Sequence, residues 1–210
     1  MTFTHNRLIA AGAMLLLAAV SIAAATSEPA LSTRGKLLFS DDFNGSALGP
    51  GWGGPKGLWE VANGSLKGSE RPEDKHAAVR RHPLQYHDAI FEFAFRFDGA
   101  KAVHLSLNNK DGHVCRLVIT PKGMLLQTDK PAKLDVKPEK LATLDTAIAP
   151  GEWHKVVVEV RGKHMTAQLD GKQAIAGESP RVDVEKGDFG FPVQGVSASF
   201  DYVKVFEVRK

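Results

Sequence analysis

The chain has 210 residues, with 27 Lys and Arg, 24 Asp and Glu, and a single cysteine. This length suits one domain with a sizeable hydrophobic core. The net charge is only +3 and the basic residues are scattered, which argues against nucleic-acid binding. One cysteine excludes an intrachain disulfide. Because Cys115 lies in an apolar run, we expect a small buried hydrophobic residue and not a catalytic thiolate.

Residues 1–25 have the three parts of a secretory signal peptide. Arg7 gives a positive start, an apolar run follows over 8–20, and Ala23 and Ala25 form the small-x-small pattern that a signal peptidase reads. A retained anchor is the alternative, but the apolar run is shorter than the roughly 20 residues of a spanning helix. We therefore expect a cleaved signal, a secreted or periplasmic protein, and no membrane span after cleavage.

The remaining sequence alternates short apolar runs with Gly, Pro, Asn and Asp turns and shows no amphipathic helix of three turns. This spacing predicts an all-β protein, a two-sheet antiparallel β-sandwich over residues 35–210, after a linker at 26–34. Asn63-Gly64 is a strong hairpin signal, and residues 129–139 are expected to be an exposed loop. Strands are expected at 36–39, 58–61, 65–67, 89–98, 103–108, 114–120, 124–128, 153–161, 165–169, 172–176, 188–193 and 197–208.

Several segments resemble the concanavalin A-like (LamG-like) jelly rolls. They cover nearly the whole chain after the signal, in the expected order: 37–45, 59–66, 151–156, 169–172 and 200–205. Within this group the chain is similar to the 3-keto-disaccharide hydrolase family, a domain of unknown function among exported bacterial proteins. The resemblance implies a secreted jelly roll that binds sugars or acts on them.

One stretch departs from that family. Its members typically read G-Y-E-x-Q after the central turn, and the matching residues here are Gly112-His113-Val114-Cys115-Arg116. Val114 stands at the glutamate position, so a carboxylate that could serve as acid or base is missing there. We therefore expect a carbohydrate-binding or carbohydrate-active domain without an assigned catalytic residue. A glycoside (3-keto-disaccharide) hydrolase is the first alternative, and a non-catalytic structural domain of an envelope protein is the second.

The predicted site follows from alternation along three strands. If Phe91, Phe93, Phe95 and Phe97 face inward, the residues between them face outward, and the same holds for the strands at 103–108 and 114–120. If those strands are neighbours, their outward side chains form one polar, concave face suited to a hydroxyl-rich ligand. An ordinary solvated sheet face is the alternative. The predicted ligand-binding residues are Glu92, Arg96, His104, Asn108 and Arg116, with Ser106 between them and Trp52 at the rim.

Roles within this site follow from residue chemistry. Arg116 offers a planar fork of donors and is the expected anchor, while His104 can donate or accept. Trp52 lies in a glycine-rich loop and is a candidate sugar platform, whereas Trp59 and Trp153 lie in strands and are expected in the core.

No cofactor is predicted. The histidines are dispersed without a zinc-ligand spacing, and a structural calcium ion between Asp42 and Asp201 is a weaker alternative. A glycan or small sugar is the expected partner, and the sequence does not indicate an oligomeric state.

Overall fold

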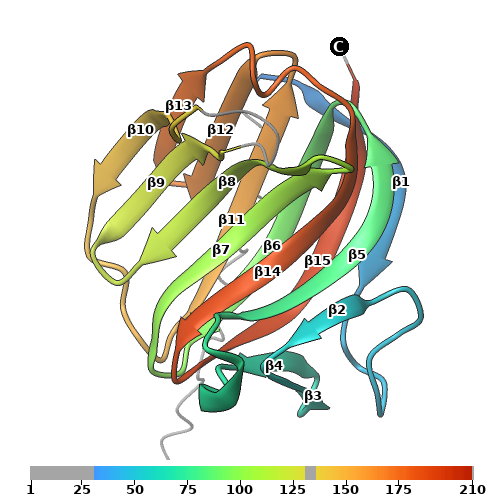
Figure 1. Ribbon diagram of the computed structural model, residues 1–210, viewed down its shortest axis with the longest axis vertical. Helices are drawn as coiled ribbons and strands as arrows, with labels where there is room; N and C mark the ends of the chain where they lie inside the picture. The colour runs from blue at the N-terminus through green and yellow to red at the C-terminus, as the bar shows by residue number, and fades with distance from the viewer. Residues whose placement is uncertain (1–30, 131–135, 210) are drawn as a thin grey trace, which may run out of the picture.

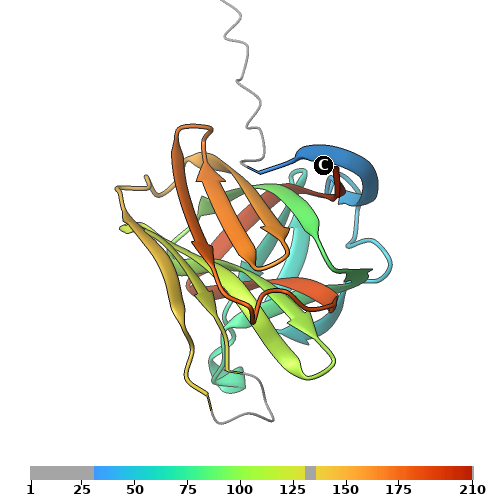
Figure 2. The same cartoon turned by 90° about the horizontal axis from the view of Figure 1, so that it is seen from above.

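The computed structural model describes residues 31–130 and 136–209, so the predicted signal peptide lies outside the described part of the chain. These residues form two antiparallel sheets packed face to face (Figure 1, Figure 2). Between them the described ranges contain one short 3-10 helix, η1 (Pro72–Asp74), no α-helix, and no helix long and apolar enough to cross a membrane. The prediction of an all-β sandwich is confirmed.

One sheet has eight strands in the order β13-β12-β11-β6-β15-β4-β3, with β1 also paired to the long β15. Because β15 is long, β4 pairs with its first half and β1 with its second half. The strands are β1 (Thr33–Asp41), β3 (Leu58–Ala62), β4 (Ser65–Ser69), β6 (Ala89–Phe97), β11 (Trp153–Arg161), β12 (His164–Leu169), β13 (Gln173–Glu178) and β15 (Ser197–Arg209).

The other sheet has seven strands in the order β10-β9-β8-β7-β14-β5-β2 and faces the viewer in Figure 1. Three of its strands, β2, β5 and β10, were not predicted. The start of β5 carries the polar run Arg80-Arg81-His82 followed by Pro83, which hides the alternation. The strands are β2 (Gly53–Lys56), β5 (Ala78–Tyr86), β7 (Ala100–Asn109), β8 (Gly112–Thr120), β9 (Gly123–Thr128), β10 (Lys140–Asp145) and β14 (Lys186–Gly195).

The Asn63-Gly64 turn joins β3 to β4 as expected. Both residues have positive φ, 53° and 70°, which is the backbone of the two-residue turn that matches the twist of a hairpin. Asparagine and glycine adopt this region with the least strain. The local sequence therefore determines this turn before any tertiary contact forms.

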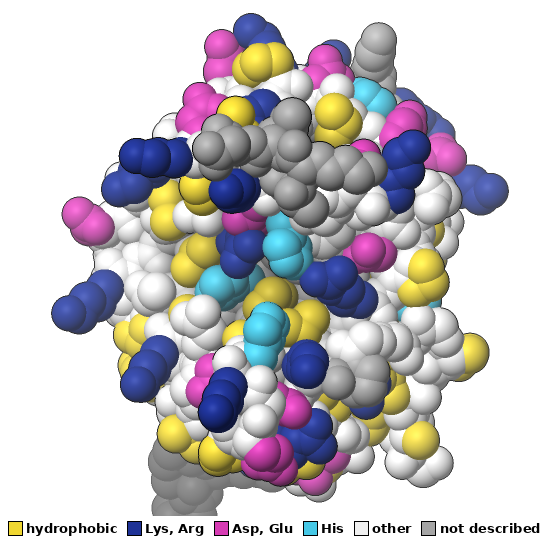
Figure 3. Space-filling model, in the orientation of Figure 1, with side chains coloured by type: hydrophobic (Ala, Val, Ile, Leu, Met, Phe, Trp, Pro, Cys, Tyr) yellow, Lys and Arg dark blue, Asp and Glu magenta, His cyan; other side chains and the backbone are white. Residues whose placement is uncertain are grey.

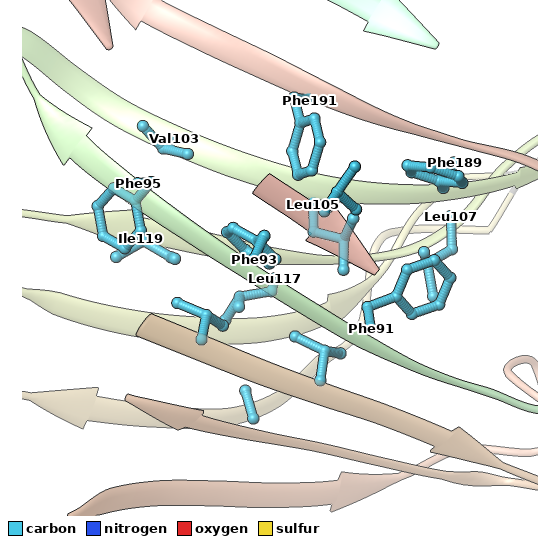
Figure 4. Packing of buried hydrophobic residues seen from close by; sticks show 14 of the residues in the cluster. Phe91, Phe93, Phe95, Val103, Leu105, Leu107, Leu117, Ile119, Phe189 and Phe191 are labelled. Carbon is cyan, nitrogen blue, oxygen red and sulfur yellow. The ribbon is translucent and has the colours of Figure 1, made fainter. Parts of the chain in front are cut away.

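Aromatic side chains of β6 and β14 fill the space between the sheets. Phe91, Phe93 and Phe95 are fully buried, as alternation predicts, and Figure 4 shows them with Phe189 and Phe191 near leucines of β7 and β8. Burying one such side chain stabilises the fold by about 1.5–3 kcal/mol. A one-residue slip of a strand would expose a whole row of them, so the core determines strand register.

Cys115 belongs to this core. It is free and fully buried, and burial raises the pKa of its thiol to about 12. The thiol is therefore protonated at neutral pH and packs as a small apolar side chain, as expected.

The end of the expected linker is part of the sheet. β1 begins at Thr33, two residues before the expected start of the domain. Just ahead of it, the Leu31 backbone N–H donates to Glu159 Oε2 at 2.8 Å, and Arg161 donates to the Leu31 carbonyl at 3.0 Å. The chain is thus bonded to the eight-stranded sheet from residue 31 onward.

Candidate functional site

Apart from Trp52, the predicted site residues fall into two groups on opposite sides of the molecule. β6 lies in the eight-stranded sheet, whereas β7 and β8 lie in the seven-stranded sheet. The expectation that the three strands are neighbours is therefore wrong. Each strand has one buried face and alternates in the same way, so alternation alone cannot reveal that the chain crosses between sheets after β6.

Glu92 and Arg96 lie on the outer face of the eight-stranded sheet, and their charges are paired there. Glu92 forms an ion pair with Arg34. Arg96 Nε donates to Asp98 Oδ1 at 2.7 Å, and its guanidinium carbon lies 4.9 Å from the ring centroid of Trp153. This is the arrangement of an ordinary half-solvated sheet face. Trp153 was expected in the core, but it is 43% exposed and lies on this outer face.

His104, Ser106 and Asn108 share the outer face of the seven-stranded sheet, since they alternate with Val103, Leu105 and Leu107 of the core. They are nevertheless only 5%, 0% and 1% exposed. Polar side chains on an outer face usually reach water, so this part of the face is recessed between its neighbours. Figure 3 shows the face, with histidine and Lys or Arg side chains gathered around its middle.

Ion pairs and hydrogen bonds connect strands β7, β8 and β14 of this face with Asp129, which follows β9. Arg116 binds Asp129 through two contacts, Nε to Oδ2 and Nη2 to Oδ1, both 2.8 Å. Asn108 Nδ2 donates to Asp188 Oδ1 at 2.5 Å, and its Oδ1 accepts from His113 Nδ1 at 2.5 Å. We call this cluster the polar recess. Its members are His104, Ser106, Asn108, His113, Arg116, Asp129 and Asp188.

His104 is the member with unused hydrogen-bonding capacity. Neither of its ring nitrogens has a partner among the described residues, although both are buried. Burial lowers its pKa to about 4, the Arg116 charge acts in the same direction, and Asp129 opposes them. At neutral pH the ring is uncharged, so one nitrogen can donate and the other can accept. Buried polar atoms without partners are rare in folded proteins and need an explanation.

His113 was not predicted because a bulge interrupts the alternation of β8. The register shifts between the pairs Leu107–Cys115 and Asn108–His113. A bulge adds one residue and reverses which side chain faces outward. Val114 was expected to face outward, but it packs in the core, and His113 meets Asn108 instead. Burial and the charges of Arg116 and Arg81 lower the pKa of His113.

Asp129 and Asp188 supply the carboxylates of the recess. Asp129 was expected in an exposed loop, but it is 4% exposed because its backbone N–H donates to Val114 and Arg116 covers its carboxylate. Residues 136–139 of the same expected loop are exposed. No short-range pattern marks Asp129, since its partner Arg116 lies on the adjacent hairpin arm.

Trp52 does not line the polar recess. Its indole N–H donates to Asp41 Oδ2 at 2.8 Å, and its ring packs 5.7 Å from Phe189 and 6.2 Å from Phe191. Both phenylalanines belong to the core, so Trp52 lies on the inner side of the seven-stranded sheet. Trp59 is half-buried and packs 6.4 Å from Phe200, close to its expected place in the core.

Across residues 31–130 and 136–209, no three His, Cys, Asp or Glu side chains gather closely enough to hold an ion. Asp42 accepts from the backbone N–H of Asn44 at 3.1 Å, and this bond lowers its pKa. A calcium ion between Asp42 and Asp201 stays a prediction.

Three solved structures with a similar fold are a carbohydrate-binding module, a laminarinase and an endo-glucanase. A carbohydrate-binding module, CBM66, from Bacillus subtilis superposes with a TM-score of 0.62 and 14% identity over 75% of this chain and 96% of its own. A laminarinase from Flavobacterium sp. UMI-01 gives 0.60 and 14%, over 82% of this chain and 100% of its own. SCLam, a non-specific endo-beta-1,3(4)-glucanase of family GH16, gives 0.60 and 14%, over 83% and 91%. At such identities the likeness shows the fold alone.

No curated protein matches the chain in sequence. A family model does, over residues 38–205, and its description is the 3-keto-alpha-glucoside-1,2-lyase-like domain. The match takes in both sheets and the whole polar recess. The chain therefore belongs to the family of 3-keto-alpha-glucoside-1,2-lyase-like domains.

Proposed function

We propose that the protein is a carbohydrate-binding domain that holds a sugar over the polar recess of the seven-stranded sheet. The observation that carries this proposal is His104, a buried ring on an outer face with two unpaired nitrogens among the described residues. A sugar hydroxyl both donates and accepts hydrogen bonds, so it can pair with either the donor nitrogen or the acceptor nitrogen of a neutral imidazole.

The rest of the recess suits the same ligand. Arg116 is already oriented by its two contacts with Asp129, so little freedom is lost when its remaining N–H groups bind hydroxyls. The hydrogen bond from Asn108 to Asp188 orients these two side chains as well. Preorganised groups of this kind are what a polar, specific ligand site needs.

A glycan array with the purified chain, followed by isothermal titration with the best ligand, tests the proposal. We expect His104→Leu to lower the affinity for that ligand by about tenfold or more, because one or two hydrogen bonds are lost, while the fold is retained. Glu92→Gln on the opposite sheet is the matched control and should leave the affinity unchanged. An unchanged affinity of His104→Leu would place the ligand elsewhere, and binding to no glycan would favour a structural domain.

A lyase that acts on 3-keto-α-glucosides is the second candidate, and the family description supports it. A 1,2-elimination removes the proton from C2, which the C3 carbonyl acidifies. The electron pair forms the C1–C2 double bond, and the substituent leaves C1 with its bonding pair and takes up a proton. His104, uncharged at neutral pH, has a lone pair that can accept the C2 proton.

The product of that elimination distinguishes catalysis from binding. Its new double bond is conjugated with the C3 carbonyl and absorbs in the ultraviolet. We expect this absorbance to rise when a 3-keto-α-glucoside is added to the chain and not when His104→Leu is used. A substrate that binds in calorimetry but gives no absorbance would favour the carbohydrate-binding function alone.

We also propose that the protein is exported, because residues 1–25 have the parts of a signal peptide. N-terminal sequencing of the protein from the periplasm or medium of its host should find a start near Thr26. A chain that still begins with Met1 would contradict cleavage.

A further inference from the structure

An open cavity lies at one edge of the sandwich, away from the polar recess. It has a volume of about 520 Å³ and is lined by the β3–β4 hairpin, the start of β5 and the loop 46–49. Sites for small ligands typically measure about 300–1,000 Å³. Two tryptophans and one arginine, Trp52, Trp59 and Arg80, contribute to its wall.

The two indoles form a rigid apolar wall. Both of their N–H groups are used within the protein, by Asp41 Oδ2 for Trp52 and by the Lys56 carbonyl for Trp59, each at 2.8 Å. Trp59 also lies flat over Gly68, where a Cβ would come within 2.5 Å of its ring. Neither indole can therefore turn a polar atom toward the cavity without breaking a bond that it already makes.

Arg80 brings a cation to this apolar wall. Its Nε is buried and has no hydrogen-bond partner, and the described residues offer its guanidinium no ion pair. Glu60 lines the cavity too, but it is exposed and forms no ion pair with Arg80 in this part of the chain. Burial lowers the pKa of Arg80, although a guanidinium stays charged at neutral pH. Because the side chain is half-buried, its charge is partly desolvated without a counter-ion among the described residues, and an anionic ligand would relieve this.

Register separates this cavity from the polar recess. Arg80 pairs with Phe191, whose side chain lies in the core, so both face the inner side of the seven-stranded sheet. Ser106 and His104 face the outer side. A ligand at Arg80 and a ligand at His104 would therefore lie on opposite sides of one sheet, with no shared side chain.

We propose that this cavity is a second binding site and takes a carboxylate-bearing sugar, such as a uronic acid. The carboxylate would accept two parallel hydrogen bonds from Arg80, and the apolar face of the ring would pack on the indole wall. A bare anion would satisfy Arg80 but leave most of the 520 Å³ cavity and its tryptophans without contacts. A neutral sugar would leave the arginine unpaired.

Isothermal titration of the full chain with glucuronate tests the proposal, with glucose, acetate and inorganic phosphate as comparison ligands. We expect glucuronate to bind at least about tenfold more tightly than any of the three, as one charge-assisted interaction plus ring packing requires. Phosphate or acetate binding as tightly as glucuronate would overturn the sugar assignment. Glucose binding as tightly as glucuronate to His104→Leu, in which the proposed sugar site of the polar recess is removed, would overturn the role of the carboxylate.

Arg80→Gln should lower the affinity for glucuronate by about tenfold or more. The amide keeps a polar end but loses the charge and the paired N–H donors of the guanidinium. His104→Leu should leave the affinity for glucuronate unchanged. A failure of this second site can therefore be told apart from a failure of the sugar site proposed at the polar recess. Thermal unfolding checks that Arg80→Gln is folded. If it is not, Arg80→Lys, which keeps the charge without the fork, should also weaken glucuronate. Unchanged affinity in a folded Arg80 variant would overturn the proposal.

Discussion

The outer faces of the two sheets carry similar residues but bury them to different depths. On the eight-stranded sheet, the Arg96 and Asp98 side chains are 34% and 20% exposed, and each has a charged partner. On the seven-stranded sheet, the Asp129 side chain is 6% exposed, and His104 is buried without a partner among the described residues. Alternation predicts both faces equally well. Burial of polar atoms, and not their presence on an outer face, therefore marks the candidate site.

The first prediction compares one arginine from each face. Arg116→Ala leaves the buried Asp129 carboxylate without its ion pair and should lower the free energy of unfolding by about 3–5 kcal/mol. Arg96→Ala breaks a more exposed pair and should cost about 1 kcal/mol or less. Urea denaturation of the two variants and the unchanged chain measures both values. Equal losses would mean that the two faces are energetically alike.

The second prediction is a pH dependence carried by His104. Its pKa is about 4 in the folded chain, against an ordinary value of 6.5. Between these values the unfolded chain binds a proton that the folded chain does not, so stability is full above pH 6.5 and is lost as the pH falls toward 4. The loss is on the order of 3 kcal/mol. The lowered pKa of His113 acts in the same direction.

Urea midpoints between pH 7 and pH 4 measure this loss. His104→Leu should flatten the pH dependence, because no proton can then bind to the unfolded chain at that position. His76→Leu, an exposed histidine near η1, is the matched control and should leave the dependence unchanged. The same slope in His104→Leu as in the unchanged chain would assign the titration to other groups.

The third prediction tests how tightly the seven-stranded face is packed. A Cβ at Gly190 would come within 2.8 Å of the Arg80 carbonyl oxygen and 2.9 Å of Arg81 Cγ, so Gly190→Ala should destabilise the domain by about 1–3 kcal/mol. It should also weaken sugar binding, because Ser106 Oγ lies only 3.4 Å from that Cβ. At Gly53 nothing lies within 4 Å, so Gly53→Ala should change stability by about 0.5 kcal/mol or less. Thermal unfolding and calorimetry compare the two, and equal behaviour would contradict a packed recess.

Local patterns were enough for much of the fold. The valine-rich run at 153–161 coincides with β11, and the Asn63-Gly64 turn joins β3 to β4. Alternation placed Phe91 and its neighbours inward, as the structure has them. Strands without alternation, such as β5, were missed. In β5 polar side chains lie on both faces of the sheet, Arg80 at the edge cavity and Arg81 on the outer face, so no apolar–polar pattern appears.

The polar recess, which is the candidate site, was predicted less completely than the fold. His104, Asn108 and Arg116 do share one face, but Glu92 and Arg96 lie on the other sheet. Asp129 and His113 join the recess through a long hairpin contact and a bulge, neither of which a short window of sequence contains. Trp52 turned inward because its ring is more favourably buried against Phe189 and Phe191 than left at a rim.

The all-β class, the turns and the core-facing side of most strands could be predicted from the sequence, because they depend on neighbours one to four residues apart. Which strands share a sheet, where a bulge reverses a side chain, and which polar groups are buried without partners became known from the structure alone. Those features depend on contacts between residues far apart along the chain, such as Asn108 with Asp188 and Arg80 with the β3–β4 hairpin. The polar recess therefore appears only when the seven-stranded sheet is assembled, and the edge cavity only when both sheets are.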